Sequence, residues 1–235
     1  MLMALILIMY GYSGHCQAKT GNPYNLDITR TIGEYHDQVL LQPGMRMVDL
    51  EKADGRIRLD IRYATKNNFT GEIIYTAAKA FAREPVANAL KKIQDSLSFY
   101  NIGLKIYDAY RPYAATVRFH EVYPDTVFVA NPRFGSRHNR GCAVDLTLVE
   151  LVTGRELPMP SEFDDFSPRA DPAYGNLPDT VLANRKFLFG IMSHFGFTHY
   201  ESEWWHFDFK GWQNYKLMDL TFDELEKAQG GIRKN

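Results

Sequence analysis

The sequence predicts an α+β fold in which helices flank a central, mainly antiparallel β-sheet. Apolar residues recur at helical spacing between residues 85 and 100, and segments that alternate apolar and polar residues surround the Asp54-Gly55 pair. Strand-like and helix-like segments follow one another without a regular βαβ repeat, which argues against a parallel sheet. The 235 residues suffice for one domain with a complete hydrophobic core, and we place that domain at residues 45–235.

The first ten residues, MLMALILIMY, form an apolar run with the length of a signal-peptide core, too short to cross a bilayer as a helix. With the small residue Ala18, this run predicts a signal peptide over residues 1–18 and a periplasmic or secreted mature chain without a membrane-spanning segment. The alternatives are a buried N-terminal element and a lipid anchor on Cys16, although the residues before Cys16 match the lipidation signal poorly. Removal of the signal peptide leaves Cys142 without a disulfide partner.

The first part of the mature chain has two distinct patterns. Residues 19–44 are mixed in composition and show no periodicity, so we expect an extended N-terminal leader packed on the domain. Residues 46–65 alternate apolar and polar side chains on both sides of Asp54-Gly55, a dipeptide that favours tight turns between strands. A β-hairpin is therefore predicted here.

An amphipathic helix is predicted for residues 85–100. Its apolar face carries five residues at helical spacing, Val86, Ala89, Leu90, Ile93 and Leu97. A short strand at residues 104–110 follows, and Arg111 lies at its end. Pro112 then begins a turn into a second helix that ends near Val122.

The remaining predicted elements lie on either side of one long loop. Residues 141–151 are apolar and rich in strand-forming residues, which predicts a strand. Residues 153–178 contain most of the later prolines and predict a long ordered loop, a feature that is often functional in compact domains. A helix over residues 180–195 and a strand over residues 205–210 complete the predicted order.

The charge and the missing motifs exclude several functional classes. With a formal net charge of −1, the chain lacks the basic excess that binds nucleic acid or an anionic membrane. It contains no Gly-x-Ser-x-Gly motif for a serine nucleophile, and His120-Glu121 is not followed by the second histidine of a His-Glu-x-x-His zinc site. The oligomeric state is left open.

The segment SRHNRGCAVD places His138 and Asp145 at a predicted loop-to-strand junction. Zinc accepts both imidazole nitrogen and carboxylate oxygen as ligands. Positions seven apart face opposite ways in a regular strand, so the two side chains converge only if the chain bends, and Gly141 permits that bend. Alone, the segment also fits a surface histidine and an aspartate in a turn.

The segment ESEWWHFDF places Glu203 and His206 among bulky aromatic residues. A dry surrounding strengthens the attraction between an ion and its ligands and raises the basicity of a buried carboxylate. An aromatic core strand with one hydrogen-bonded histidine is the alternative. Together the two segments supply three ligands, His138, Asp145 and His206, and a carboxylate for the open fourth position, as a catalytic zinc requires.

Several segments resemble one enzyme family. SRHNRGCAVDLTL and EWWHF are similar to the zinc D-alanyl-D-alanine dipeptidases of the VanX type, in peptidase family M15, which have a hedgehog-like D,D-peptidase fold. RYATKNNFTG at 62–71, DAYRP at 108–112 and ELPMPSEFDDFS at 156–167 resemble family segments in the same order. The resemblance runs from about residue 45 to 210 and implies one zinc ion per chain and hydrolysis of a small D,D-dipeptide.

The resemblance implies roles for the residues around the metal. His138, Asp145 and His206 match the zinc ligands, and Glu203 matches the general base that deprotonates the water and later protonates the leaving amine. Arg111, in DAYRP, resembles the arginine that stabilises the tetrahedral oxyanion, a role suited to a permanently charged guanidinium. A surface arginine in a salt bridge is the alternative for Arg111.

The resemblance also implies substrate contacts. Asp164 resembles the carboxylate that pairs with the free ammonium group of the substrate, although the adjacent Asp165 is a second candidate. Tyr63 and Ser136 are expected to line the substrate pocket or to serve structure alone. Cys142 replaces a serine that is common in the family, and it is read as a small buried side chain or a fourth soft ligand.

Two other functions use the same residues. A D,D-carboxypeptidase or endopeptidase would act on longer peptidoglycan peptides, whereas a carboxylate at Asp164 that holds a free amine restricts the substrate to a dipeptide. A non-catalytic zinc-binding module would need neither Glu203 nor Arg111, because structural zinc sites are normally closed by four protein ligands.

Overall fold

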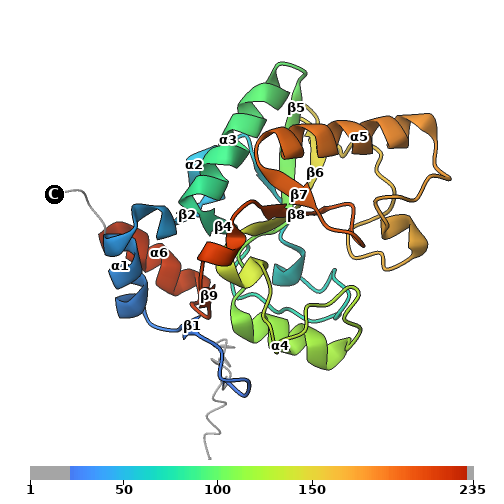
Figure 1. The fold of residues 1–235 in the computed structure, drawn as a ribbon. Helices are drawn as coiled ribbons and strands as arrows, with labels where there is room; N and C mark the ends of the chain where they lie inside the picture. The colour runs from blue at the N-terminus through green and yellow to red at the C-terminus, as the bar shows by residue number, and fades with distance from the viewer. Residues whose placement is uncertain (1–21, 232–235) are drawn as a thin grey trace, which may run out of the picture.

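The computed structural model describes residues 22–231, which form an α+β fold around a five-stranded sheet (Figure 1). The strand order is β3-β5-β6-β8-β7. These strands are β3 (Arg58–Leu59), β5 (Ile102–Asp108), β6 (Ala143–Glu150), β8 (His206–Phe209) and β7 (Phe197–His199). β3 pairs with β5 in parallel and the other neighbours are antiparallel, so the predicted fold class is confirmed.

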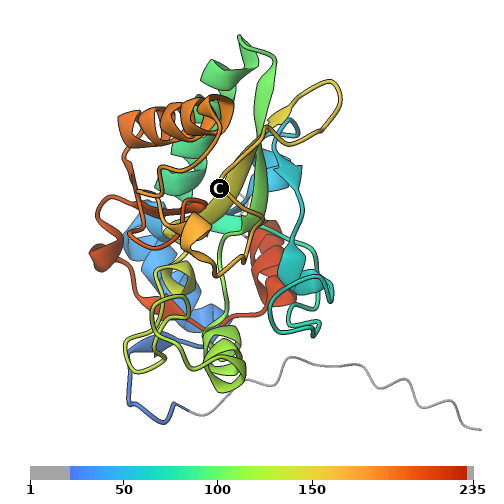
Figure 2. The same ribbon diagram turned by 90° about the vertical axis from the view of Figure 1, so that its right-hand side faces the viewer.

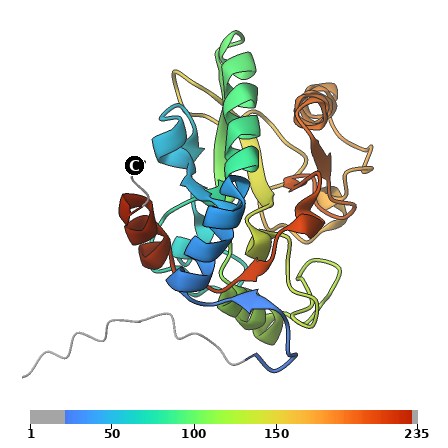
Figure 3. The same ribbon diagram turned by 60° about the vertical axis from the view of Figure 1, so that its left-hand side comes forward.

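The long helices lie around this sheet as the apolar periodicity predicts. α3 (Glu84–Ser98) runs along the sheet and buries its apolar stripe against it (Figure 3). α5 (Asp179–His194) packs beside β7, and α4 (Tyr113–Val122) lies at the other end of the sheet (Figure 1). The predictions for these three helices and for the strands around residues 104–110, 141–151 and 205–210 are confirmed to within two residues at each predicted end.

The prediction of an extended leader at residues 19–44 is wrong for its second half, which contains helix α1 (Ile32–Leu41). Thr31 and Glu34 form a capping box, in which each side chain accepts a hydrogen bond from the other residue's backbone N–H. Only Tyr35 and Val39 are buried on this helix. Such a narrow apolar stripe gives little periodicity in the sequence, and the cap was the available signal.

The same segment is integrated into the fold rather than attached to it. β1 (Ile28–Thr29) pairs in parallel with β9 (Leu217–Met218). Helix α1, in blue, lies beside helix α6 (Phe222–Gly231), in red, at one side of the molecule (Figure 1). The Tyr35 hydroxyl accepts a hydrogen bond from the Met47 backbone N–H at 2.8 Å. The two ends of the described chain therefore stabilise each other.

The predicted hairpin around Asp54-Gly55 is also wrong. β2 (Met47–Asp49) pairs antiparallel with β4 (Phe81–Arg83), while β3 joins the central sheet. The Asp49 side chain accepts hydrogen bonds from the Glu51 and Lys52 N–H groups, which starts the short helix α2 (Leu50–Ala53). This helix cap ends the strand before the Asp-Gly turn is reached.

The connections contain short 3₁₀ helices and one long excursion. The 3₁₀ helices are η1 (Pro43–Met45), η2 (Arg62–Ala64), η3 (His138–Arg140), η4 (Pro168–Ala170) and η5 (Trp212–Asn214). After β6 the chain projects beyond the sheet and then returns toward α5 (Figure 2). Apart from η4 and a bridge between Val149 and Glu156, residues 153–178 form the loop that was predicted.

The predicted signal peptide and Cys16 lie outside the described residues. Within residues 22–231, every helix is too short or too polar to cross a membrane.

Candidate metal centre and active site

Three neighbouring strands place Asp108, Asp145 and His206 in one row across the sheet. Asp108 on β5 is paired with Asp145 on β6, and Asp145 is paired with His206 on β8. Side chains of directly paired residues lie on the same face of a sheet. Strand register therefore brings together three polar side chains that are far apart in the sequence.

His138 reaches this row from η3 because the chain bends at Gly141. Gly141 has a φ of 69°, in the left-handed region, and β6 begins two residues later. A Cβ atom at this position would lie 2.8 Å from Cε of Met47, so any other residue would also have to displace that buried side chain. The predicted bend is present, and His138 Nε2 lies 3.4 Å from Asp145 Oδ1.

His138, Asp145 and His206 form a buried cluster of potential metal ligands. His206 Nδ1 is 3.0 Å from Asp145 Oδ1 and 3.1 Å from His138 Nε2. Ligands about 2.0–2.1 Å from a tetrahedral zinc are about 3.3 Å apart, so these spacings fit such an ion. Asp145 Oδ1 is buried and makes no hydrogen bond to the described residues, as expected for an atom that awaits a cation.

Hydrogen bonds behind the cluster aim both imidazole rings. The Nδ1–H of His138 donates to the Ala109 carbonyl at 2.7 Å, and the Nε2–H of His206 donates to Asp208 Oδ1 at 3.0 Å. Each ring consequently turns its other nitrogen toward Asp145, and at this nitrogen a metal ion would take the place of a proton.

The charges in the cluster also favour a bound cation. Burial alone would lower the pKa of His206, but Asp208 and Asp145 raise this pKa to about 10. Burial opposes ionisation of Asp145, yet the His138 and His206 rings hold the Asp145 pKa below its usual range. The centre therefore stabilises positive charge between the two rings and the carboxylate.

Cys142 is not part of the cluster. Its Sγ atom lies 3.6 Å from the Arg140 carbonyl, and burial raises the pKa of the thiol to about 12. The geometry matches the small buried side chain and not the fourth ligand.

Glu203 lies beside the cluster in an aromatic surrounding. Its Oε2 atom is 3.7 Å from His206 Nδ1, and the following Trp204 and Trp205 are both buried. Burial and the nearby Asp145 charge raise the pKa of Glu203 to about 8, although His206 opposes the shift. A carboxylate with this pKa can accept and return a proton near neutral pH.

Arg111 presents a fixed positive charge to the same cluster. Its Nε and Nη2 atoms donate to Asp108 Oδ2 at 3.0 and 2.8 Å, and Nη2 is 3.9 Å from Asp145 Oδ2. Asp108 is held in turn by the Tyr75 hydroxyl at 2.8 Å, and the guanidinium lies over the Phe119 ring at 4.7 Å. Burial lowers the pKa of Arg111, but the negative charge of Asp108 outweighs this effect and raises that pKa. Arg111 is therefore a buried cation and not a surface residue in a salt bridge.

Asp164 supplies a second carboxylate at a distance from the cluster. It accepts a hydrogen bond from the Tyr63 hydroxyl at 3.1 Å through Oδ1, while its buried Oδ2 has no partner among the described residues. Burial and the Asp145 charge raise the pKa of Asp164 to about 8. Asp165 instead accepts hydrogen bonds from the N–H and hydroxyl of Ser167, so it caps a turn.

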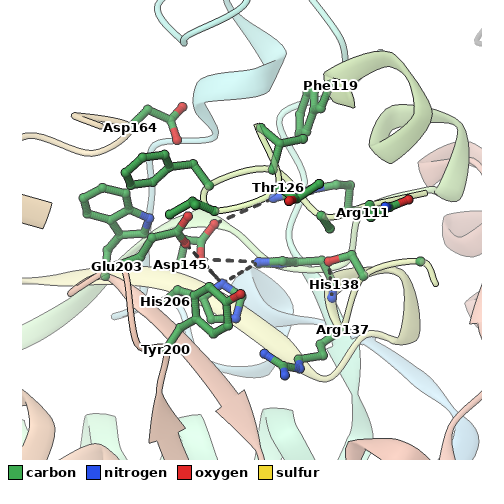
Figure 4. A pocket seen from close by; sticks show the side chains of 18 of the residues that line it. Arg111, Phe119, Thr126, Arg137, His138, Asp145, Asp164, Tyr200, Glu203 and His206 are labelled. Atoms are coloured by element: carbon green, nitrogen blue, oxygen red, sulfur yellow. Dashed lines mark hydrogen bonds and ion pairs between the residues drawn. The ribbon is translucent and has the colours of Figure 1, made fainter. Parts of the chain in front are cut away.

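One cavity of about 610 Å³ is lined by the eight residues to which the sequence analysis assigned a catalytic, substrate-binding or metal-binding role (Figure 4). Its lining includes Tyr63, Arg111, Ser136, His138, Asp145, Asp164, Glu203 and His206. Ser136 also fixes the start of η3, because its hydroxyl accepts a hydrogen bond from the His138 N–H at 3.2 Å. The structure thus brings the eight residues together around one space.

Four supporting residues were missed in the sequence. Asp108 anchors Arg111, Asp208 orients His206, and Arg137 donates to Asp208 Oδ2 at 2.8 Å. The Asn139 side chain donates to the Arg111 carbonyl and accepts from the Ser136 N–H, which joins the two loops of the site. Asp108 lies in the DAYRP segment close to Arg111, and Asp208 lies in the ESEWWHFDF segment close to His206. This closeness in the sequence could have indicated that the two aspartates support those residues.

Comparisons with known proteins give one consistent result. Residues 44–225 match the Peptidase M15 family model, described as D-ala-D-ala dipeptidase. The chain is 34% identical over 176 residues to a D-alanyl-D-alanine dipeptidase of Escherichia coli (strain K12), covering 75% of this chain and 91% of the relative. It is 32% identical over 171 residues to a D-alanyl-D-alanine dipeptidase of Enterococcus faecium, covering 64% and 85%.

A solved structure of VanYB in complex with D-Alanine-D-Alanine is a more distant match. The TM-score is 0.39 at 12% sequence identity, over 67% of this chain and 82% of that chain. This likeness is too weak to carry an argument about the site.

Proposed function

The chain belongs to the M15 peptidase family and is therefore a hydrolase of peptide bonds, and we propose that it is a zinc dipeptidase that cleaves D-alanyl-D-alanine. Four similar proteins from different bacteria share the description D-alanyl-D-alanine dipeptidase, which supports this substrate. The chain covers 85–91% of each of these relatives.

The single observation that carries the proposal is the unpaired Asp164 oxygen in the same cavity as the metal ligands. A buried carboxylate oxygen without a hydrogen-bond donor is costly unless a ligand supplies one. An ammonium group supplies both the donor and the opposite charge. Because an internal residue of a longer peptide has no free amine, this pairing selects a dipeptide.

Zinc fits the ligand cluster by donor type, spacing and orientation. His138 Nε2, His206 Nδ1 and Asp145 Oδ1 are nitrogen and oxygen donors of the kind found in catalytic zinc sites, which keep a fourth position open. When bound, zinc makes water acidic enough to be a nucleophile at neutral pH and polarises a carbonyl group.

The neighbouring side chains supply the remaining steps. Glu203 accepts the proton of the attacking water and returns it to the amine of the departing alanine. Arg111, held by Asp108, faces the oxygen on which negative charge develops. The buried Trp205 lines the cavity, limits the access of bulk water and strengthens both interactions.

The proposal is tested by comparing three substrates with the zinc-loaded protein. We expect rapid hydrolysis of D-Ala-D-Ala, and slow hydrolysis of N-acetyl-D-Ala-D-Ala and of a pentapeptide that ends in D-Ala-D-Ala. A preference for the pentapeptide would indicate a D,D-carboxypeptidase. A folded, zinc-loaded protein that is inert toward all three would indicate a binding module.

We also propose that the enzyme acts in the periplasm or outside the cell. The apolar run at residues 1–10 supports export. Cell fractionation with an antibody to the mature chain tests this, and a uniformly cytoplasmic protein would contradict it.

A further inference from the structure

Arg137 is a positive charge in the cavity wall that the proposed reaction does not use. It precedes the metal-ligand candidate His138 in the sequence and lines the same cavity. Taking the dipeptidase function above as the premise, we propose that Arg137 binds the C-terminal carboxylate of the dipeptide. The enzyme would then recognise both charged ends of its substrate.

The guanidinium of Arg137 is held in place with donors to spare. Its Nη1 donates to Asp208 Oδ2 at 2.8 Å, and its central carbon lies 5.2 Å from the Tyr200 ring and 5.0 Å from the Trp212 ring. No oxygen of residues 22–231 accepts a hydrogen bond from Nε or Nη2 of this side chain. Two aromatic rings and one carboxylate thus fix the planar guanidinium group of Arg137, whose Nε and Nη2 atoms can still donate hydrogen bonds to a ligand.

Arg137 and Asp164 offer opposite charges to the two charged ends of a dipeptide within one cavity. Asp164 and Arg137 lie on opposite sides of the cluster formed by His138, Asp145 and His206 (Figure 4). The Tyr200 ring that contacts Arg137 also contacts the His206 ring, with centroids 5.2 Å apart. With its amine at Asp164 and its peptide bond at the cluster, a dipeptide directs its carboxylate toward the Arg137 side.

A carboxylate in this cavity needs a cation, because the ionised Asp145 repels it. Arg111 already makes two hydrogen bonds to Asp108. Arg140 donates to the Tyr215 carbonyl and lies over the Trp212 ring. Compared with Arg111 and Arg140, Arg137 has N–H donors available to a ligand, because only its Nη1 atom donates to Asp208 and its side chain is 34% exposed.

The test compares D-Ala-D-Ala with D-alanyl-D-alaninamide, which lacks the terminal negative charge. A charge-assisted hydrogen bond typically changes binding by roughly 10- to 100-fold. We expect the wild-type protein to favour the free acid by that factor in kcat/KM, and Arg137→Ala to bring the acid-to-amide ratio close to one. Arg137→Lys keeps the positive charge but lacks the planar guanidinium group, so it should give an intermediate acid-to-amide ratio.

Arg133→Ala is the matched control, since Arg133 lies in the same loop over the Tyr24 ring and does not line the cavity. It should retain the wild-type ratio. An unchanged ratio in both Arg137 variants overturns the proposal. Equal loss on both substrates with loss of bound zinc also overturns it, because Arg137 then acts through Asp208 on His206. A wild-type protein that cleaves neither compound instead refutes the dipeptidase function, and this proposal with it.

Discussion

The metal-ligand cluster and the Asp164 end of the cavity are built in different ways. Asp145 and His206 lie opposite each other on central strands, and hydrogen bonds from behind aim both histidine rings. Asp164 lies in the long loop between β6 and α5, in a left-handed conformation with a φ of 61°, and one hydrogen bond from Tyr63 holds it.

This difference separates the chemistry from the choice of substrate. Ligands and proton-transfer groups need fixed geometry, which sheet strands provide better than loops. A carboxylate that only pairs with an ammonium group tolerates more movement, and its loop can vary without disturbing the strands. Substitutions at the cluster should therefore reduce turnover or metal binding, whereas substitutions at Asp164 should change substrate preference.

The largest effect is expected at the cluster, from Glu203→Gln. The amide cannot accept the proton of the attacking water, so kcat should fall by about 10²- to 10⁴-fold. Zinc content, measured by atomic absorption, should stay at one ion per chain because Glu203 is not a proposed ligand. A variant with near-normal kcat would remove Glu203 from the mechanism.

A smaller effect is expected one layer further out, from Asp208→Asn. The amide oxygen can still accept the His206 Nε2–H, but the negative charge behind the ring is lost. Zinc affinity should fall by about 10- to 100-fold, as is typical when a hydrogen-bond partner of a metal-binding histidine is changed. Competition with a fluorescent chelator measures this, and unchanged affinity would show that Asp208 has no influence on the centre.

Asp164→Asn tests the loop side of the comparison. The amide keeps the hydrogen bond to Tyr63 but loses the charge, so kcat/KM for D-Ala-D-Ala should fall by about 10- to 100-fold, mainly through KM. Zinc content should be normal. Asp165→Asn, next to it in the turn, is the control and should leave KM unchanged. Equal effects of the two substitutions would contradict the amine-binding role.

The smallest expected effect is a change in the pH dependence of stability. The folded state retains the Asp164 proton up to a pKa of about 8, whereas an unfolded aspartate loses it near about pH 3.9. The folded state therefore binds more protons between these values, and stability falls as the pH rises through them. Glu203, with a pKa of about 8, acts in the same direction.

Urea denaturation of the metal-free protein at several pH values measures this slope. Each such carboxyl group contributes at most about 1.4 kcal/mol per pH unit. Asp164→Asn should remove its share, so the variant should lose less stability between about pH 4 and 8 than the wild type. Identical slopes would mean that Asp164 ionises normally in the folded protein.

Local patterns predicted the elements whose signals lie within one segment. α3 and α5 follow from their apolar periodicity and β6 from its apolar run, and the bend at Gly141 follows from the need to bring His138 to Asp145. Two short motifs indicated the metal ligands and Glu203, whereas the family resemblance indicated the other four residues of the cavity, Tyr63, Arg111, Ser136 and Asp164. Their individual roles remain predictions.

The wrong predictions involve competition between local signals or partners distant in the sequence. At residues 46–65 the Asp49 cap prevails over the Asp54-Gly55 turn, and β2 finds its partner in β4. α1 shows little periodicity because only two of its residues are buried. The contact between Tyr63 and Asp164 joins residues more than one hundred positions apart, so no local pattern could distinguish Asp164 from Asp165.

Zinc titration of the chelator-treated protein tests the central claim most directly. The account predicts that D-Ala-D-Ala hydrolysis disappears on metal removal and returns in proportion to added zinc, with saturation at one equivalent per chain. His206→Ala should abolish this recovery while the protein stays folded. Hydrolysis that persists without metal, or full zinc binding without hydrolysis of D-Ala-D-Ala, would contradict the account.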